Sequence, residues 1–244
     1  MNLVVLLRRL RGTPEGHEGY RPAGGLLGRC DAAALRAALA LRAEVGGATI
    51  TAVAAGPADR EVEVLTYALS AGADCAVRVS DPGLAWVDYH GVARVLAAAV
   101  RRIGHDLILA GDRSEDEAQG AVGPAVAEWL QIPHLTGAID VRLAVQNGSA
   151  GVLVTRRDPG HVRTLKVPLP ALLTVVSFPR QVSAPAKQGS IESIELESLG
   201  IQSAELKHRD GCMGDALPVR VTKNATVVKD ADELVARLRE ERLV

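Results

Sequence analysis

The sequence predicts an α/β protein built on a mostly parallel, doubly wound sheet. Short apolar runs alternate with helix-like segments through the first half of the 244 residues, which is the pattern of successive βαβ crossovers. Hydrophobic residues make up 48% of the chain and aromatic residues only 2%, so the core must consist mainly of Ala, Val and Leu. Such residues suit parallel strands, because these are buried on both faces.

The first half contains four apolar runs of strand length, each followed by a segment with the apolar spacing of a helix. Asp31 is expected to cap the first helix, and Gly46 with Gly47 to end it. A Gly- and Pro-rich stretch at 11–29 predicts a long loop before that helix. The strands are expected at 3–7, 49–53, 75–79 and 106–110, and the helices at 32–44, 59–70, 88–100 and 120–130.

The pattern changes in the second half, where short strand candidates are separated by turn residues. Asn147-Gly148 and Pro159-Gly160 favour hairpins or tight turns, so antiparallel additions beside the parallel sheet are expected. From Ser177 onward the chain is polar and irregular until a final amphipathic helix at 230–242. We therefore predict a domain at 1–176 with hairpin additions and an extended C-terminal arm at 177–244. The short strands are expected at 139–145, 151–155, 163–166 and 171–176.

Charge and cysteine content exclude several classes of function. The 28 basic and 29 acidic residues give a net charge of −1, so no field of one sign favours nucleic acid or a membrane surface. No apolar stretch is long enough to cross a bilayer, so membrane insertion is not expected. Cys30, Cys75 and Cys212 are too far apart for a zinc site or a disulfide framework, which indicates a reducing, cytoplasmic location.

A candidate nucleotide site lies where strands of the predicted sheet end. Ligands of open α/β sheets bind outside the carboxyl ends of the strands. The stretch 110–116 leaves such an end and leads to Gly120-Ala121-Val122-Gly123 at a helix start, where free N–H groups can hold a phosphate. Asp116 could cap that helix or accept hydrogen bonds from a ribose. A plain loop-to-helix connection is the alternative, and Arg8-Arg9 could face a phosphate or lie in a solvated loop.

Several stretches, in order and at family spacing, resemble the β subunit of electron transfer flavoproteins. No single stretch is diagnostic, but the ordered set spans nearly the whole chain. The stretches are TAVAAGP at 51–57, ALSAGAD at 68–74, DLILAG at 106–111, DEAQGAVGP at 116–124 with AEWL at 127–130, LPALLTV at 169–175, PR at 179–180 and DELVARL at 232–238.

The resemblance implies a domain of the adenine nucleotide alpha hydrolase-like type, paired with an α subunit that carries most of an FAD site. It implies AMP in this subunit, a flavin dehydrogenase as electron donor, a quinone reductase or similar acceptor, and an arm that packs on the partner subunit. The residues carried over by position as the nucleotide site are Leu6, Gly28, Arg29, Cys30, Asp31, Ala55, Asp116, Glu117, Ala118, Gln119, Gly120, Ala121, Val122, Gly123, Pro124, Ala125, Val126 and Ala127.

The chain also departs from the family pattern. Gly28-Arg29-Cys30 stands where relatives commonly have Asn-Pro-aromatic, Ala118 replaces an acidic residue, and Ala121 replaces a usual Gln. The segment after Arg180, which relatives use to recognise dehydrogenases, looks shortened, and its lysine run is reduced to Lys187. Arg156-Arg157 lies in the region that approaches the partner's flavin in the family, with an ion pair to Asp158 or to the partner as the alternative.

The preferred hypothesis is an electron carrier rather than a bond-making enzyme. An electron-bifurcating β subunit with its own second FAD is the first alternative, although the loop after the first strand lacks the Val-Pro-Asp pattern of such proteins. A stand-alone nucleotide-binding module similar to universal stress proteins is the other, although it leaves residues 139–244 unexplained.

Overall fold

The computed structural model describes residues 1–10, 27–57, 61–146, 149–180, 182, 185–187, 189–206 and 227–243. The chain divides into two units, Met1–Asp210 and Gly211–Val244, and each is described by itself.

The first unit is built on one sheet whose nine strands, among the described residues, lie in the order β7-β6-β5-β8-β4-β1-β2-β3-β9. Pairing is parallel from β5 through β8 and β4 to β9, and antiparallel from β5 to β7. The strands are β1 Asn2–Leu6, β2 Thr49–Gly56, β3 Cys75–Ser80, β4 Leu107–Gly111, β5 His134–Gln146, β6 Ser149–Asp158, β7 His161–Pro168, β8 Ala171–Val175 and β9 Ile191–Glu195.

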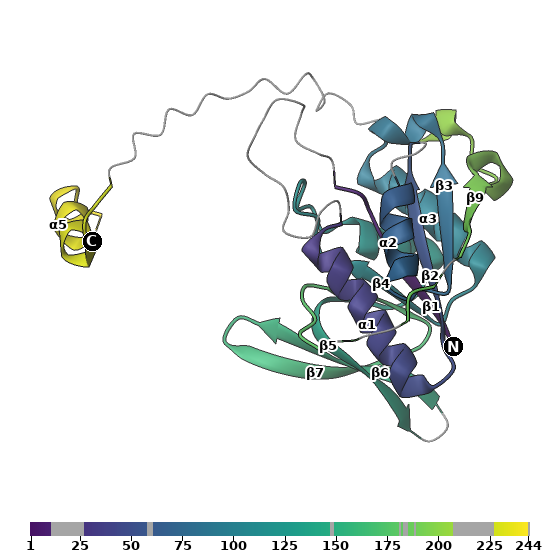
Figure 1. Ribbon diagram of the computed structural model, residues 1–244, viewed down its shortest axis with the longest axis horizontal. Helices are drawn as coiled ribbons and strands as arrows, with labels where there is room; N and C mark the ends of the chain where they lie inside the picture. The colour runs from purple at the N-terminus through teal and green to yellow at the C-terminus, as the bar shows by residue number, and fades with distance from the viewer. Residues whose placement is uncertain are drawn as a thin grey trace. The chain divides into compact units, whose positions relative to one another are not determined.

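Helices cover both faces of the parallel part, so the predicted doubly wound α/β fold is confirmed. Helices α1 and α2 share one apolar cluster with the sheet, and α3 and α4 share another on the opposite face. Figure 1 shows α1 and α2 in front of the sheet and α3 behind it. The helices of this unit are α1 Arg29–Val45, α2 Val62–Ser70, α3 Tyr89–Ile103 and α4 Val122–Leu130, with short 3-10 helices η1 Pro82–Trp86, η2 Leu196–Leu199 and η3 Ser203–Glu205.

The start of α1 differs from the sequence prediction. The helix begins at Arg29, and its N-cap is Gly28, which makes no side-chain cap. Asp31 is therefore not the cap: it lies in the first turn, and its carboxylate accepts a hydrogen bond from the backbone N–H of Arg8 instead. The predicted end is confirmed, because Gly46 adopts a left-handed conformation with φ of 71° that suits a residue without Cβ.

Two other predicted boundaries fall partly outside the described residues. The predicted loop at 11–29 lies outside them except for its last three residues. The predicted start of the second helix, residue 59, also lies outside them, and α2 is observed from Val62.

The predicted hairpin additions are confirmed in β5, β6 and β7. The Asn147-Gly148 turn lies outside the described residues, but β5 and β6 pair antiparallel on both sides of it. Gly160, with φ of 81°, stands in the turn between β6 and β7. The strand β8 differs from these three because it pairs parallel with both β4 and β5.

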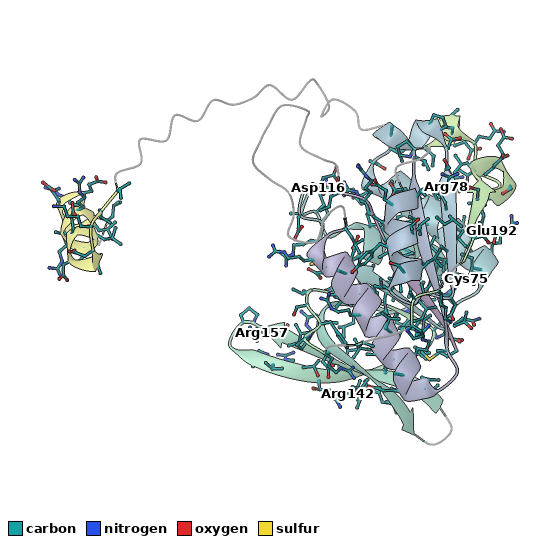
Figure 2. The ribbon with its side chains drawn as sticks, viewed as in Figure 1. Cys75, Arg78, Asp116, Arg142, Arg157 and Glu192 are labelled. Atoms are coloured by element: carbon teal, nitrogen blue, oxygen red, sulfur yellow. The ribbon has the colours of Figure 1, made fainter. Side chains whose placement is uncertain are left out.

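The expected irregularity after Ser177 is wrong for Ile191–Glu195, which form β9 and extend the sheet beside β3. The strand is hard to see in the sequence because it is an edge strand: Ile194 is buried, whereas Glu192 and Ser193 are exposed. Figure 2 shows Arg78 and Glu192 at this edge. Lys187 holds the segment before β9 against the end of α2 and the start of β3. Its ammonium group pairs with Asp74, and its backbone N–H donates to the carbonyl of Leu69 at 3.1 Å.

The second unit contains the helix α5, Ala231–Glu240, within the predicted range 230–242. Asp230 is its N-cap, and its carboxylate accepts a hydrogen bond of 2.9 Å from the backbone N–H of Glu233. Leu234 and Val235 are exposed on this helix. Within the described part of the chain, no helix has both the length and the apolar character needed to span a membrane.

Candidate functional site

A cavity opens at the carboxyl ends of the neighbouring strands β1, β2 and β4. One wall comes from the loops after β1 and β4 together with the start of α4. The other comes from η1 and the start of α3. Its lining residues are Leu6, Leu7, Arg8, Arg9, Leu10, Asp31, Ala55, Gly56, Pro57, Glu61, Leu84, Ala85, Val87, Tyr89, Val92, Leu96, Ala110, Gly111, Asp112, Arg113, Ser114, Glu117, Gln119, Gly120, Ala121, Val122 and Gly123.

Arg8 connects two loops of the polar wall. It follows β1, and its guanidinium group pairs with the carboxylate of Asp116 at 2.9 Å and that of Glu117 at 3.5 Å. The same group donates to the hydroxyl of Ser114 at 3.2 Å. Asp116 lies at the carboxyl ends of the strands, near the start of α1 (Figure 2). Arg8 thereby holds the loop after β1 against the loop that leads to α4.

Asp31 fixes the same two loops from inside the wall. Its carboxylate accepts hydrogen bonds from the backbone N–H of Arg8, at 3.0 Å, and of Gly111. Burial raises the pKa of Asp31 to about 7, and these two N–H groups and the charge of Arg8 oppose the rise. A Cβ at position 111 would lie 2.0 Å from Oδ1 of Asp31, so glycine is required at the end of β4.

The chain turns sharply before α4. Ala118 and Gly120 have φ of 54° and 64°, whereas Ala121, the N-cap of α4, is right-handed with φ of −94°. Adjacent left- and right-handed residues direct successive N–H groups into one concavity that favours an anion. Pro124 lies in the first turn of the helix, where its missing N–H removes no intrahelical bond.

Asp112 ties the cavity to the sheet beyond it. Its carboxylate accepts hydrogen bonds from the hydroxyl of Thr174 on β8 at 2.7 Å and from the N–H of Gly137 on β5 at 3.1 Å. Thr174 is buried, and a Cβ at Gly123 would lie 2.7 Å from its methyl group. Helix α4 therefore packs closely on β8, and the loop after β4 is held at a fixed height above the sheet.

The second wall is apolar. Leu84 of η1, Val87 directly after η1 and Leu96 of α3 are all buried and belong to one apolar cluster with Leu6. The entry into η1 is fixed by Asp81, whose carboxylate accepts a hydrogen bond of 2.7 Å from the N–H of Gly83. The cavity thus presents charges and backbone N–H groups on one side and a hydrocarbon surface on the other.

Half of the residues that the resemblance assigns to the nucleotide line this cavity. They are Leu6, Asp31, Ala55, Glu117, Gln119, Gly120, Ala121, Val122 and Gly123. The other residues of the set stand beside it or beneath it rather than in its lining. They are Gly28, Arg29, Cys30, Asp116, Ala118, Pro124, Ala125, Val126 and Ala127.

Some members of the second group have other partners. Arg29 pairs with Glu115, and Val126 and Ala127 are buried in the core under α4. The thiol of Cys30 donates to the carbonyl of Val176 at 3.4 Å, and burial raises its pKa, which opposes thiolate formation. Cys30 is therefore better explained as a small packing residue than as a reactive thiol.

The resemblance did not assign the apolar wall or Arg113 to the site. Arg113 could have been recognised as a site residue from the sequence, because it closely follows the end of a predicted strand. Leu84 and Ala85 could not, since they belong to a short 3-10 segment between β3 and α3. Arg156, in the hairpin region, pairs with Asp158 at 2.8 Å. The described residues contain no group of three or more His, Cys, Asp or Glu that could hold a metal ion.

Comparison with known proteins places the chain in a family. Residues 22–199 match the model of the electron transfer flavoprotein domain. The chain is 30% identical to the electron transfer flavoprotein subunit beta of Bacillus subtilis, with 100% of both chains covered. It is 26% identical to the subunit of that name from Thermoanaerobacterium thermosaccharolyticum, over 98% of this chain and 94% of the relative.

A third relative, Protein FixA of Bradyrhizobium diazoefficiens, is 36% identical over 62% of this chain and 54% of its own length. The resemblance identified from the sequence stretches is confirmed by these matches. The chain belongs to the electron transfer flavoprotein beta-subunit family.

Proposed function

We propose that this chain is the β subunit of a heterodimeric electron carrier, which holds AMP in its cavity and shares an FAD site with an α subunit. The observation that carries the proposal is the two-sided cavity at the carboxyl edge of β1, β2 and β4, in a chain of this family. The chain contributes binding and positioning, and no bond-making step is assigned to it.

The polar wall fits the phosphate of a mononucleotide. The N–H groups around Gly120 and Ala121 face one concavity, and the positive end of the α4 dipole adds to it. Arg8 and Arg113 line the same side. Arg8 is already paired with Asp116 and Glu117, so little cationic charge is left for a long polyphosphate. This balance favours a single phosphate.

The apolar wall fits an adenine ring. Leu84, Val87 and Leu96 offer a hydrocarbon surface, and Ala55 on β2 leaves room because its side chain is small. Binding sites for small molecules commonly combine such a surface with a few polar groups that fix orientation. In this arrangement AMP is structural: it fills the cavity and holds its two walls at a fixed separation.

The flavin would supply the redox chemistry. The protein's part in such a carrier is to position the isoalloxazine ring and to set its potential through nearby charges and hydrogen bonds. We propose that a flavin dehydrogenase is the donor and a quinone reductase or similar protein the acceptor, and that all act in the cytoplasm. Of the residues from 177 onward, β9 and 201–206 pack on this chain's own sheet, and α5 would contribute to docking on the α subunit.

The test is co-expression of the full chain with its α subunit, followed by denaturation and mass spectrometry of the released nucleotides. One FAD and one AMP per heterodimer are expected. Two FAD molecules and no AMP per heterodimer would mean that a second flavin takes the place of AMP, and would assign the chain to electron bifurcation. Absence of flavin, together with a free homodimer of this chain in size-exclusion chromatography, would contradict the carrier function and favour a stand-alone nucleotide-binding module.

A further inference from the structure

A short segment far along the chain fastens the apolar wall of the cavity. The hydroxyl of Ser203, in η3, donates to the carboxylate of Asp81 at 3.0 Å. The same oxygen of Asp81 accepts the N–H of Gly83 at 2.7 Å. One carboxylate oxygen thus joins the entry of η1 to a residue 122 positions away.

Gly83 makes this contact possible. A Cβ at position 83 would lie 2.0 Å from the hydroxyl oxygen of Ser203 and 2.9 Å from Oδ1 of Asp81. The backbone conformation of Gly83 is not left-handed, so the reason for glycine here is space rather than strain. The two segments therefore meet with backbone against side chain, and neither can move away without breaking the bond to Asp81.

Residues 201–206, which we term the strap, are anchored at both ends. Ile201 and Leu206 are buried, with 3% and 2% of their surface exposed. Both belong to the apolar cluster that contains Leu84 and Val87 of the cavity wall. Between them Glu205 pairs with Arg94 on α3 at 2.8 Å. The strap thus lies against the elements that form the wall.

We propose that Ser203 is a positioning residue for nucleotide binding: through Asp81 it holds η1 in the conformation that forms the apolar wall. A 3-10 helix of five residues has poor hydrogen-bond geometry of its own, so its conformation depends on outside contacts. The inference rests on the proposed function in one respect only, namely that the ligand is AMP. The fastening of η1 by Ser203 stands on the contacts alone.

The first experiment compares the full chain with Ser203→Ala, using Ser198→Ala as the matched control. Ser198 lies on η2, where its hydroxyl donates to the carbonyl of Glu195 at 2.8 Å and accepts a hydrogen bond from Arg102 at 3.4 Å; neither partner lines the cavity. Hydrogen exchange at residues 83–87, measured without nucleotide, is expected to be about five- to tenfold faster in Ser203→Ala, as suits the loss of one partly buried hydrogen bond. Ser198→Ala should leave that exchange unchanged.

The second measurement is calorimetric titration with AMP. Because an unfastened wall must be ordered when the ligand binds, the dissociation constant is expected to rise about five- to tenfold in Ser203→Ala and to stay unchanged in Ser198→Ala. The midpoint of global unfolding should change little by comparison, since residues 83–87 are a small part of the unit.

A double-mutant cycle tests the contact from its other side. Gly83→Ala alone should weaken AMP binding more than Ser203→Ala does, because its Cβ collides with the hydroxyl of Ser203. In the Ser203→Ala background the nearest atom of residue 203 is its Cβ, 3.4 Å away, so the collision with residue 203 is relieved and only the approach of 2.9 Å to Oδ1 of Asp81 remains. The double variant should therefore bind AMP more tightly than Gly83→Ala alone.

The outcomes separate the two proposals. Faster exchange at 83–87 together with weaker AMP binding supports both. Faster exchange in a chain that binds no AMP supports the fastening and overturns the nucleotide assignment. Unchanged exchange and unchanged affinity in Ser203→Ala, or strict additivity in the cycle, would overturn the role of Ser203.

Discussion

The two walls of the cavity are held in different ways. The polar wall is fastened by Asp31 and Arg8, which join the ends of β1 and β4, two strands that are neighbours in the sheet. The apolar wall is fastened by Asp81, whose partner Ser203 is 122 residues away. The first wall is thus built into the core of the fold. The second depends on the strap, whose one side-chain hydrogen bond to Asp81 fixes the entry of η1, and this is where we expect the cavity to be adjustable.

Gly111→Ala tests the rigidity of the polar wall and should have the largest effect. The new Cβ would lie 2.0 Å from Asp31 Oδ1, 2.9 Å from the Asp31 nitrogen and 3.1 Å from the carbonyl carbon of Cys30. Because two of these atoms are backbone, they cannot swing aside, and the free energy of unfolding should fall by about 3 kcal/mol in urea titrations. Gly47→Ala, with no atom within 4 Å of its Cβ, is the control. Equal stability of the two variants would show that the polar wall rearranges to accommodate the added Cβ and is not rigid.

Asp31→Asn tests the same wall through pH. Since burial raises the pKa of Asp31 from 3.8 to about 7, ionisation costs more in the folded state than in the unfolded state. The stabilising contribution of the neutral carboxyl is full below pH 4, falls as pH rises, and is lost above about pH 7. Relative to Asp31→Asn, the wild type should lose about 2 kcal/mol between pH 5 and pH 7.

The measurement is the urea midpoint of both proteins at pH 5, 6, 7 and 8, the range being set by the pKa of about 7. A difference between the two proteins that is the same at every pH would contradict a raised pKa. In that case the N–H groups of Arg8 and Gly111 would outweigh the cost of burying the charge.

Arg8→Lys tests whether the geometry of the guanidinium matters or only its charge. Lysine keeps the charge but cannot reach Asp116, Glu117 and Ser114 together. Because the Arg8 side chain is 31% exposed, we expect a loss of stability of about 1 kcal/mol or less, and weaker AMP binding by calorimetry. Arg142→Lys, on β5 with a side chain 62% exposed, should change neither quantity.

The same contrast explains what could be predicted from the sequence. The strands of the parallel core were predicted because they are apolar runs, and the start of α4 was marked as a phosphate site by its glycines and its place after a strand. These are local signals. The clamp made by Asp31 was mistaken for a helix cap, because an Asp near a helix start has both uses and only the position of Arg8 decides between them.

The apolar wall and β9 were missed for the opposite reason. In β9 the single buried Ile194 lies between polar residues, and the strand exists because β3 offers an edge. The wall at Leu84 depends on the hydrogen bond between Ser203 and Asp81. No pattern in the sequence around Ser203 marks it as a partner of Asp81. Contacts between residues more than 100 positions apart leave no periodic pattern, so they become visible only in the folded chain.

Glu205→Gln separates the two contacts of the strap and should have the smallest effect. Glu205 pairs with Arg94, but the two side chains are 47% and 31% exposed, so the ion pair is worth at most about 0.5 kcal/mol. The equilibrium constant for unfolding in urea and the dissociation constant for AMP should both stay within about twofold of the wild-type values. If Glu205→Gln instead weakened AMP binding as much as Ser203→Ala, surface charge rather than the hydroxyl bond to Asp81 would hold the apolar wall. The two walls would then share one means of attachment, because both would depend on an arginine paired with a carboxylate.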